Sequence, residues 1–160
     1  MSLFEFAVKS PVGRLRIIGG DEGLRAILWP DDDPARVKFE IAPKKSSTPL
    51  LLDVASQLEE YFAGRRSEFD VELDFRGTDF QRSVWKELSR IGYGRTTSYG
   101  ELAKRVGRPT GARAVGAAVG RNPISIVVPC HRVIGASGKL TGFAGGLGAK
   151  THLLELESRR

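Results

Sequence analysis

A single cysteine, Cys130, limits how this 160-residue chain can be stabilised. One thiol cannot form an internal disulfide, and one cysteine with two histidines cannot supply the four ligands of a structural zinc site. The fold must therefore rest on hydrophobic packing, for which a content of 41% hydrophobic residues is sufficient. The length suits one ordinary domain or two small ones that share a core.

The residues around Cys130 favour reactivity over packing. An apolar run over residues 124–128 leads into Pro129-Cys130-His131-Arg132-Val133. We expect this run to form a strand with the sulfur at its end, beside a histidine and an arginine that can stabilise a thiolate. A lone cysteine is most often a buried small hydrophobe, so packing is the alternative that the neighbouring residues argue against.

Charge is divided unevenly between the two halves of the chain. Residues 1–75 carry 10 Lys and Arg against 14 Asp and Glu, a balance of −4. Residues 76–160 carry 15 against 5, a balance of +10. Such a basic half is typical of a surface that faces a polyanion, with a merely solubilising basic surface as the alternative.

The first half is predicted to form a small antiparallel sheet followed by a helix. Apolar runs over residues 3–9, 14–18 and 24–29 are separated by turn signals. The helix is predicted to stop at Gly64, and its apolar face comprises Leu51, Val54, Ala55, Leu58 and Phe62. Residues 69–75 alternate apolar and acidic side chains, which indicates a half-buried strand or an extended linker. The carboxylates at 31–33 precede a proline and indicate a solvated loop rather than a metal site.

The basic half is predicted to contain a helix-turn-helix. Capping boxes at Thr78-Asp79-Phe80-Gln81 and Ser98-Tyr99-Gly100-Glu101 start two helices, the second of which ends near Gly107. A third helix follows Thr110 and runs over residues 111–120. The last two helices are short and joined by a turn that contains glycine and proline, as in DNA-binding helix-turn-helix units.

The helix over residues 111–120 is almost bare of side chains. It consists of glycine, alanine and valine, with one long side chain, Arg113, near its start. Proteins that read the major groove present several long polar side chains, which are missing here. The helix suits a narrow groove and sequence-independent binding, with tight packing against another helix as the alternative.

The segment over residues 124–133, together with Thr141-Gly142-Phe143-Ala144-Gly145-Gly146, resembles the active-site signature of the O6-alkylguanine-DNA alkyltransferases. The resemblance extends from about residue 80 to residue 157. It implies an α+β fold with a ribonuclease-H-like scaffold domain over residues 1–75. A mostly helical domain over residues 76–160, with a winged-helix-like helix-turn-helix, would then bind DNA and transfer the alkyl group.

By this resemblance Cys130 accepts the alkyl group. An ordinary thiol is only a few per cent ionised at pH 7, and neighbouring side chains of a strand point to opposite faces, so His131 is expected to act through a bridging water. Glu157 on the last helix would orient His131, with Glu155 as the competing carboxylate. Asn122 resembles the hinge asparagine that bonds across the turn before the cysteine.

The resemblance also implies how DNA is held. The bare helix enters the minor groove, where Ala112, Ala114 and Gly116 contact DNA and Arg113 fills the space left by an extruded nucleotide. Tyr99 assists the rotation of that nucleotide and donates a hydrogen bond to guanine, which makes it part of both the binding and the catalytic set. A packed aromatic is the alternative for Tyr99.

The alkylated base is expected to bind beside the Gly-rich loop over residues 142–146. The resemblance implies that the carbonyls of Cys130 and Val133 read the guanine amino group and that the Ala144 N–H contacts O6. Phe143 stands where tyrosine is common, and Ala144 replaces a hydroxyl residue. Ser125 stands where some relatives carry a proline that lines the alkyl pocket.

We therefore predict a DNA-repair protein that moves an alkyl group irreversibly from O6 of guanine, and more weakly from O4 of thymine, onto Cys130. It would act once per molecule, without cofactor or metal, as a monomer on double-stranded DNA, with cooperative binding as an open alternative. No membrane segment or secretory signal is expected, and the location would be cytoplasmic, or at the nucleoid in a prokaryote. A Cys-His hydrolase and a non-catalytic module that recognises alkylated bases are the rival functions.

Overall fold

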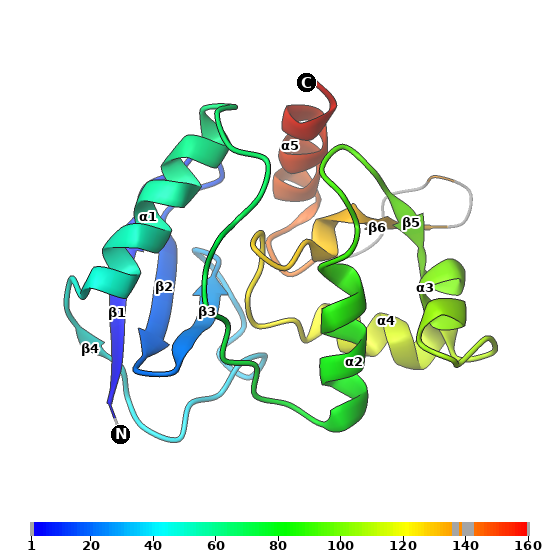
Figure 1. The fold of residues 1–160 in the computed structure, drawn as a ribbon, viewed down its shortest axis with the longest axis horizontal. Coiled ribbons are helices and arrows are strands. Elements are labelled where there is room, and N and C mark those ends of the chain that lie inside the picture. Colours follow the sequence, from blue (N-terminus) through cyan, green and yellow to red (C-terminus); the bar gives the residue numbers. More distant parts are fainter. Residues whose placement is uncertain (1, 136–137, 139–142, 160) are drawn as a thin grey trace.

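The computed structural model describes residues 2–135, 138 and 143–159 (Figure 1). A four-stranded sheet of order β3-β2-β1-β4 lies at one side of the molecule, with α1 against it, and the other helices form the second side. The first-half elements are β1 (Leu3–Val8), β2 (Leu15–Gly20), β3 (Gly23–Leu28), β4 (Lys44–Lys45) and α1 (Pro49–Phe62). The helices of the second half are α2 (Asp79–Leu88), α3 (Tyr99–Arg105), α4 (Ala112–Gly120) and α5 (Leu147–Ser158). The predicted α+β class is confirmed.

The sheet forms where the apolar runs predict it. Strands β1, β2 and β3 pair antiparallel, and a bulge lies between Ile18 and Gly19 before the tight turn into β3. Gly23 follows that turn with a φ of 133°, in the region that favours glycine. All six residues of β3 are buried, and Val37 and Phe39 of the following loop pack on Ala26 and its buried neighbours.

Helix α1 ends near the predicted stop, and its first turn is capped. The Thr48 hydroxyl accepts a hydrogen bond from the Leu51 N–H, and Pro49 occupies the first turn, where a missing N–H costs nothing. The helix ends at Phe62, two residues before Gly64, whose φ is 76°. The buried side of α1 also contains Tyr61, a polar residue that the predicted apolar face did not include.

The two halves share one hydrophobic core, because the second half pairs with the edge of the sheet at β3. The Leu24 N–H donates to the Glu72 carbonyl, and the Ile27 N–H donates to the Pro123 carbonyl at 2.9 Å. Residues 69–75 therefore form an extended segment with a single bridge at Leu73 rather than a full strand. The bond to Pro123 fixes the chain just after α4 against the sheet.

The strand predicted over residues 124–128 is wrong. Ile124 makes one bridge to β3, but the chain then turns, with the Val128 N–H donating to the Ile124 carbonyl, and Cys130–Arg132 form a 3₁₀ turn, η1. The cause of the turn is local, because a proline lies at each end of the apolar run and the side chain of Asn122 forms hydrogen bonds across it. Two short strands that the sequence did not indicate, β5 (Thr97–Ser98) and β6 (Val133–Ile134), pair in parallel beside η1.

None of the described helices is both long enough and apolar enough to cross a membrane. The Asp31–Asp33 loop is stabilised as a turn, as predicted. The Asp32 carboxylate accepts a hydrogen bond from the Trp29 N–H and pairs with Arg36, while Asp33 accepts one from the Ala35 N–H. These carboxylates are thus engaged by protein groups.

Candidate active site and DNA-binding surface

Cys130 lines a cavity of about 200 Å³ that gathers most of the predicted site residues. The thiol residue is 6% exposed. Of the predicted residues, the cavity contains Tyr99, Gly116, Asn122, Ser125, Phe143 and Ala144. It also contains Arg36 from the first half and Lys150 from α5, neither of which the sequence singled out. The structure thus brings the candidate nucleophile, the bare helix and the Gly-rich loop to one place.

The short parallel pair β5 and β6 positions this cavity. Strand β5 leads directly into α3, whose first residue is Tyr99, and β6 directly follows η1, which begins at Cys130. Pairing of Thr97 with Val133 therefore ties the start of α3 to the cysteine segment. The Ser98 hydroxyl accepts a hydrogen bond from the Glu101 N–H at 3.1 Å and fixes the first turn of α3.

Behind the cavity, His131 belongs to a buried ionic network. Its Nε2 lies 2.7 Å from Oε2 of Glu157, as the predicted pairing requires, whereas Glu155 is exposed. The Arg132 guanidinium donates to both oxygens of Glu157, at 2.8 and 2.9 Å, and the Tyr61 hydroxyl donates to Oε2 at 2.6 Å. Glu157 is 2% exposed and accepts hydrogen bonds from three residues, one of them from the other half of the chain.

This network sets the protonation of its members. Burial by itself raises the pKa of Glu157, but hydrogen bonds from His131 and Arg132 outweigh it and bring the pKa to about 2. Burial lowers the pKa of His131, so the imidazole is neutral at neutral pH despite the adjacent carboxylate. Its Nδ1 is buried and forms no hydrogen bond with any described residue. A neutral imidazole with one unengaged nitrogen can take up a proton.

Arg132 does not stabilise a thiolate at Cys130 as we predicted. Arg132 turns away to Glu157 and to the Ile91 carbonyl, and burial raises the pKa of Cys130 above its ordinary value. A hydrogen bond from Asn122 and the positive charges of Arg36 and Lys150 each lower the pKa of Cys130 and partly oppose the effect of burial. The resting thiol is therefore protonated and needs a base to react.

Asn122 bonds across the turn that precedes the cysteine. Its Nδ2 donates to the Val128 carbonyl at 2.9 Å, and its Oδ1 accepts from the Ile124 N–H at 3.1 Å. Within this turn Ile126 has a φ of 73°, which is strained for a β-branched residue and is held by the surrounding bonds. The side chain of Asn122 therefore shapes the segment that presents Cys130.

The Ser125 hydroxyl is bonded to a residue that is distant in the sequence. Its Oγ accepts a hydrogen bond from Nε1 of Trp29 at 3.1 Å, and the serine is 1% exposed. Trp29 also contacts the Gly-rich loop, since its ring packs edge-on against Phe143 at 5.3 Å. A Cβ on Gly145 would lie 2.5 Å from the Trp29 ring, so this close approach requires glycine.

The carbonyls predicted to read guanine already have protein partners. The Val133 carbonyl accepts from Lys150 Nζ at 2.6 Å, and the Cys130 carbonyl accepts from the Val133 N–H. Each carbonyl retains a second lone pair. Ala144 is exposed and Phe143 half-buried at the cavity, whereas Gly142 of the predicted loop lies outside the described residues.

Helices α3 and α4 form the predicted helix-turn-helix, and α4 turns its small side chains outward. Arg113 and Ala114 are exposed, and Ala112 and Gly116 are half-buried. The inner side is fixed by packing and by a hydrogen bond of 2.8 Å from Trp85 Nε1 to the Ala118 carbonyl. A Cβ on Gly116 would lie 3.6 Å from the ring of Tyr99, so the bare helix lies against that tyrosine beside the cavity.

Comparison with known proteins identifies the family. Residues 3–75 match the profile described as 6-O-methylguanine DNA methyltransferase, ribonuclease-like domain. Residues 79–159 match the profile described as 6-O-methylguanine DNA methyltransferase, DNA binding domain. The chain belongs to this family.

Individual methyltransferases of the family resemble the chain over nearly its whole length. The methylated-DNA–protein-cysteine methyltransferase of Mycolicibacterium paratuberculosis is 51% identical over 95% of this chain and 90% of its own. The one from Methanosarcina acetivorans is 47% identical over 93% and 94%. Crystal structures of the O6-methylguanine methyltransferase of Mycobacterium tuberculosis, alone and with DNA, cover 99% of this chain and 94% of theirs. Both have a TM-score of 0.88, at 49% and 46% identity. Membership makes this chain a DNA-repair enzyme that transfers alkyl groups from DNA to a protein cysteine.

Several residues of this methyltransferase site were missed from the sequence. Tyr61 and Trp29 lie in the first half and reach the site only through the fold, although a tyrosine on an apolar helix face is a usable signal. Arg36 and Lys150 lie in a loop and a helix where a basic residue is ordinary. His152 takes no part and is half-buried beside Phe62.

Proposed function

We propose that the protein repairs O6-alkylguanine in double-stranded DNA by moving the alkyl group onto Cys130, and O4-alkylthymine more weakly. The observation that carries this proposal is that Cys130 lines a cavity bordered by the bare helix, while the next residue, His131, pairs with the buried Glu157. We also propose the division into residues 1–75 and 76–160 as scaffold and active domains. The protein would act as a monomer in the cytoplasm, cooperatively on DNA.

Binding begins with α4 in the minor groove. Its exposed face, with Ala112, Ala114 and Gly116, allows the backbone to approach the groove closely. The damaged nucleotide leaves the stack at a cost of a few kcal/mol, and Arg113 occupies the space it leaves. Tyr99 lies between the bare helix and the cavity, a position from which it can assist rotation and bond to the base.

The base then enters the cavity beside the thiol. The second lone pairs of the Cys130 and Val133 carbonyls accept from the guanine amino group, and the Ala144 N–H bonds to O6. The side chains of Phe143 and Ser125 line the space for the alkyl group. Since Ala144 has no hydroxyl, O6 is recognised at that point by backbone alone.

Transfer requires removal of the thiol proton. Because burial keeps Cys130 protonated, a water carries its proton to Nδ1 of the neutral His131, and Glu157 stabilises the imidazolium that forms. The sulfur attacks the alkyl carbon, the carbon–O6 bond breaks, and its electron pair stays on guanine. Guanine then accepts a proton, which balances the one that the thiol gave to His131. A thioether has no easy reverse reaction, so each molecule acts once.

The test is mass spectrometry of the protein after incubation with an O6-methylguanine duplex. We expect a gain of one methyl group at Cys130. Cys130→Ser should abolish transfer while DNA binding stays nearly unchanged, because serine is a far weaker nucleophile of similar size. Transfer by this variant near the wild-type rate, or methylation elsewhere, would contradict the proposal.

A further inference from the structure

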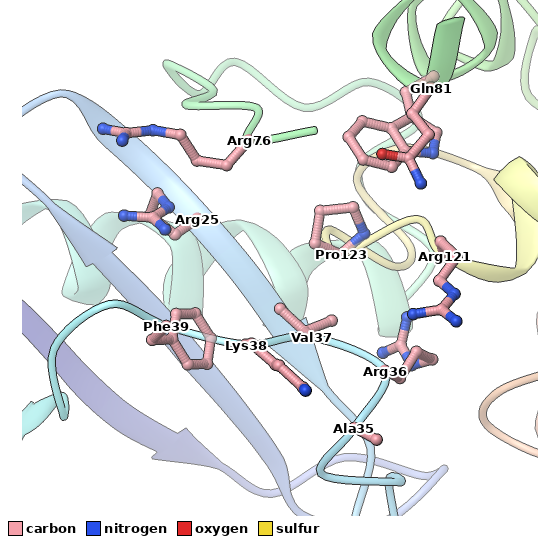
Figure 2. Close-up of a pocket in the computed structure, with 11 residues that line it drawn as sticks. Arg25, Ala35, Arg36, Val37, Lys38, Phe39, Arg76, Gln81, Arg121 and Pro123 are labelled. Atoms are coloured by element: carbon pink, nitrogen blue, oxygen red, sulfur yellow. The ribbon is translucent and has the colours of Figure 1, made fainter. Parts of the chain in front are cut away.

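A second cavity, of about 450 Å³, lies between the first-half loop over residues 35–39 and the start of α2. Its size is in the range that holds ligands in proteins. Five of its lining residues are basic, and none is acidic; the basic residues are Arg25, Arg36, Lys38, Arg76 and Arg121. Figure 2 shows Arg25 and Arg76 at one end, Arg36 and Arg121 at the other, and Lys38 between them.

Three of the five cations are neutralised by carboxylates that do not line the cavity. Glu40 pairs with Arg25 through two hydrogen bonds, Asp32 pairs with Arg36, and Asp74 pairs with Arg76. Within the described residues, no carboxylate lies within 4.0 Å of the charged groups of Lys38 or Arg121. Both are exposed, so the cavity has an excess of positive charge that an anion would balance.

The cavity adjoins the site already described. Arg121 is the C-cap residue that directly follows α4, and Arg36 lines both cavities. Nη1 of Arg36 donates to the Asn122 carbonyl at 2.6 Å and so separates the two spaces. A duplex that lies along α4 would therefore pass the basic cavity at the C-terminal end of that helix.

We propose that this cavity binds backbone phosphates of the DNA held by α4, and so extends the DNA contact onto the first half of the chain. The inference rests on the proposed docking of α4 on DNA. Phosphate is the fitting ligand because Lys38, near the middle of the cavity, and Arg121, at one end, can each hold one phosphate of a repeating anion. Lys38 and Arg121 provide the unneutralised charges. The role assigned to the first half is thus more than that of a scaffold, despite its net negative charge.

The experiment measures DNA affinity against salt concentration for Lys38→Ala, Arg121→Ala and a matched control. Each lost phosphate contact should reduce the slope of log K against log salt by about 0.9. We expect that reduction for each variant and roughly twice as much for the double variant. Lys44→Ala is the control, since it removes an exposed lysine from the same half, in β4, away from the cavity.

Reaction with free O6-methylguanine base separates this inference from the proposed function. The Lys38 variant should methylate Cys130 from the free base at the wild-type rate while its DNA salt slope falls. Equal slope changes in the Lys38 and Lys44 variants would mean diffuse surface charge and would overturn the phosphate site. An unchanged slope in both cavity variants would overturn it as well. If the wild type failed to methylate Cys130, the proposed function itself would fail, whatever the slopes.

Discussion

The two sides of Cys130 are built on opposite principles. Behind it, Glu157 and the groups bonded to it are buried and tightly paired, and one partner, Tyr61, comes from the sheet side of the molecule. In front lies a cavity bordered by a bare helix and a Gly-rich loop, with few side chains that fix a ligand. The rear positions His131 and Glu157 before substrate binds, whereas the front leaves room for the alkylated guanine.

If this contrast is right, damage at the rear should cost stability as well as activity, and damage at the exposed residues of the front should alter substrate use alone. Buried ion pairs resist the loss of one partner, because the other charge remains in a medium that solvates it poorly. Substitution of small residues at an exposed surface removes few contacts, so it should change the shape of that surface more than the stability of the fold. The following variants test that difference from the largest expected effect to the smallest.

Removal of the Glu157 carboxylate should have the largest effect. Glu157→Ala leaves the buried Arg132 without its partner, which should lower the free energy of unfolding by about 3 to 5 kcal/mol and abolish transfer. Urea unfolding of this variant and of Glu155→Ala, an exposed neighbour, makes the comparison. Equal stability of the two variants would show that the rear network is not structural.

Arg113→Ala should be the largest change at the front. The side chain is exposed, so folding should be unaffected, but duplex repair should slow by about a hundredfold, the equivalent of a few kcal/mol of unstacking. Reaction with the free alkylguanine base needs no flipping and should keep its rate. Arg90→Ala removes an exposed arginine outside the helix-turn-helix and serves as the control. An equal loss of rate with duplex DNA and with the free base would mean that Arg113 acts in the transfer reaction instead.

The front of the site was more predictable from the sequence than the rear. Caps, turns and the small residues of α4 act locally, so the helix-turn-helix and the position of Arg113 could be predicted from spacing alone. The Cys130 segment could not, because Asn122 bonds across it and converts an expected strand into a turn. The pairing of His131 with Glu157 was indicated by family resemblance and helical register.

What the sequence could not give was contact between distant segments. Tyr61 and Glu157 are separated by 96 residues, as are Trp29 and Ser125. The two contacts form across the boundary that β3 makes by pairing with Pro123, which holds the halves together. The expectation that Arg132 stabilises the thiolate failed for the same reason, since its partner lies on α5.

Tyr61→Phe tests whether the first half tunes the chemistry. The hydroxyl bonds to the same oxygen of Glu157 that faces His131, so its loss should make the carboxylate more basic and raise the pKa of His131. If neutral His131 is the base, the transfer rate should begin to fall at a higher pH than in the wild type when the pH is lowered. At a pH below the pKa of His131 in the variant, the rate should be lower than in the wild type by about tenfold. The pH profile of the rate with free base measures it.

The control for Tyr61→Phe is Tyr93→Phe. The Tyr93 hydroxyl donates to the Leu156 carbonyl at 3.5 Å. The Tyr93→Phe variant should be somewhat less stable than the wild type, but its transfer rate should fall at the same acidic pH as in the wild type. A similar shift in both variants, or in neither, would mean that the hydroxyl of Tyr61 only supports packing.

The smallest effect should come from Ser125→Pro, at the wall of the front cavity. The ring would offer apolar surface to a bulky adduct, so the ratio of benzyl to methyl transfer should rise by the equivalent of about 1 kcal/mol. The change also removes the acceptor of the buried Trp29 N–H, which should lower stability by about 1 to 3 kcal/mol. Ser125→Ala separates the two effects, because it loses the same acceptor without gaining the ring. Second-order rates with the two free bases give the ratio of benzyl to methyl transfer for each variant. If this ratio rose as much in Ser125→Ala as in Ser125→Pro, the selectivity would depend on the released Trp29 and the loop that packs on it.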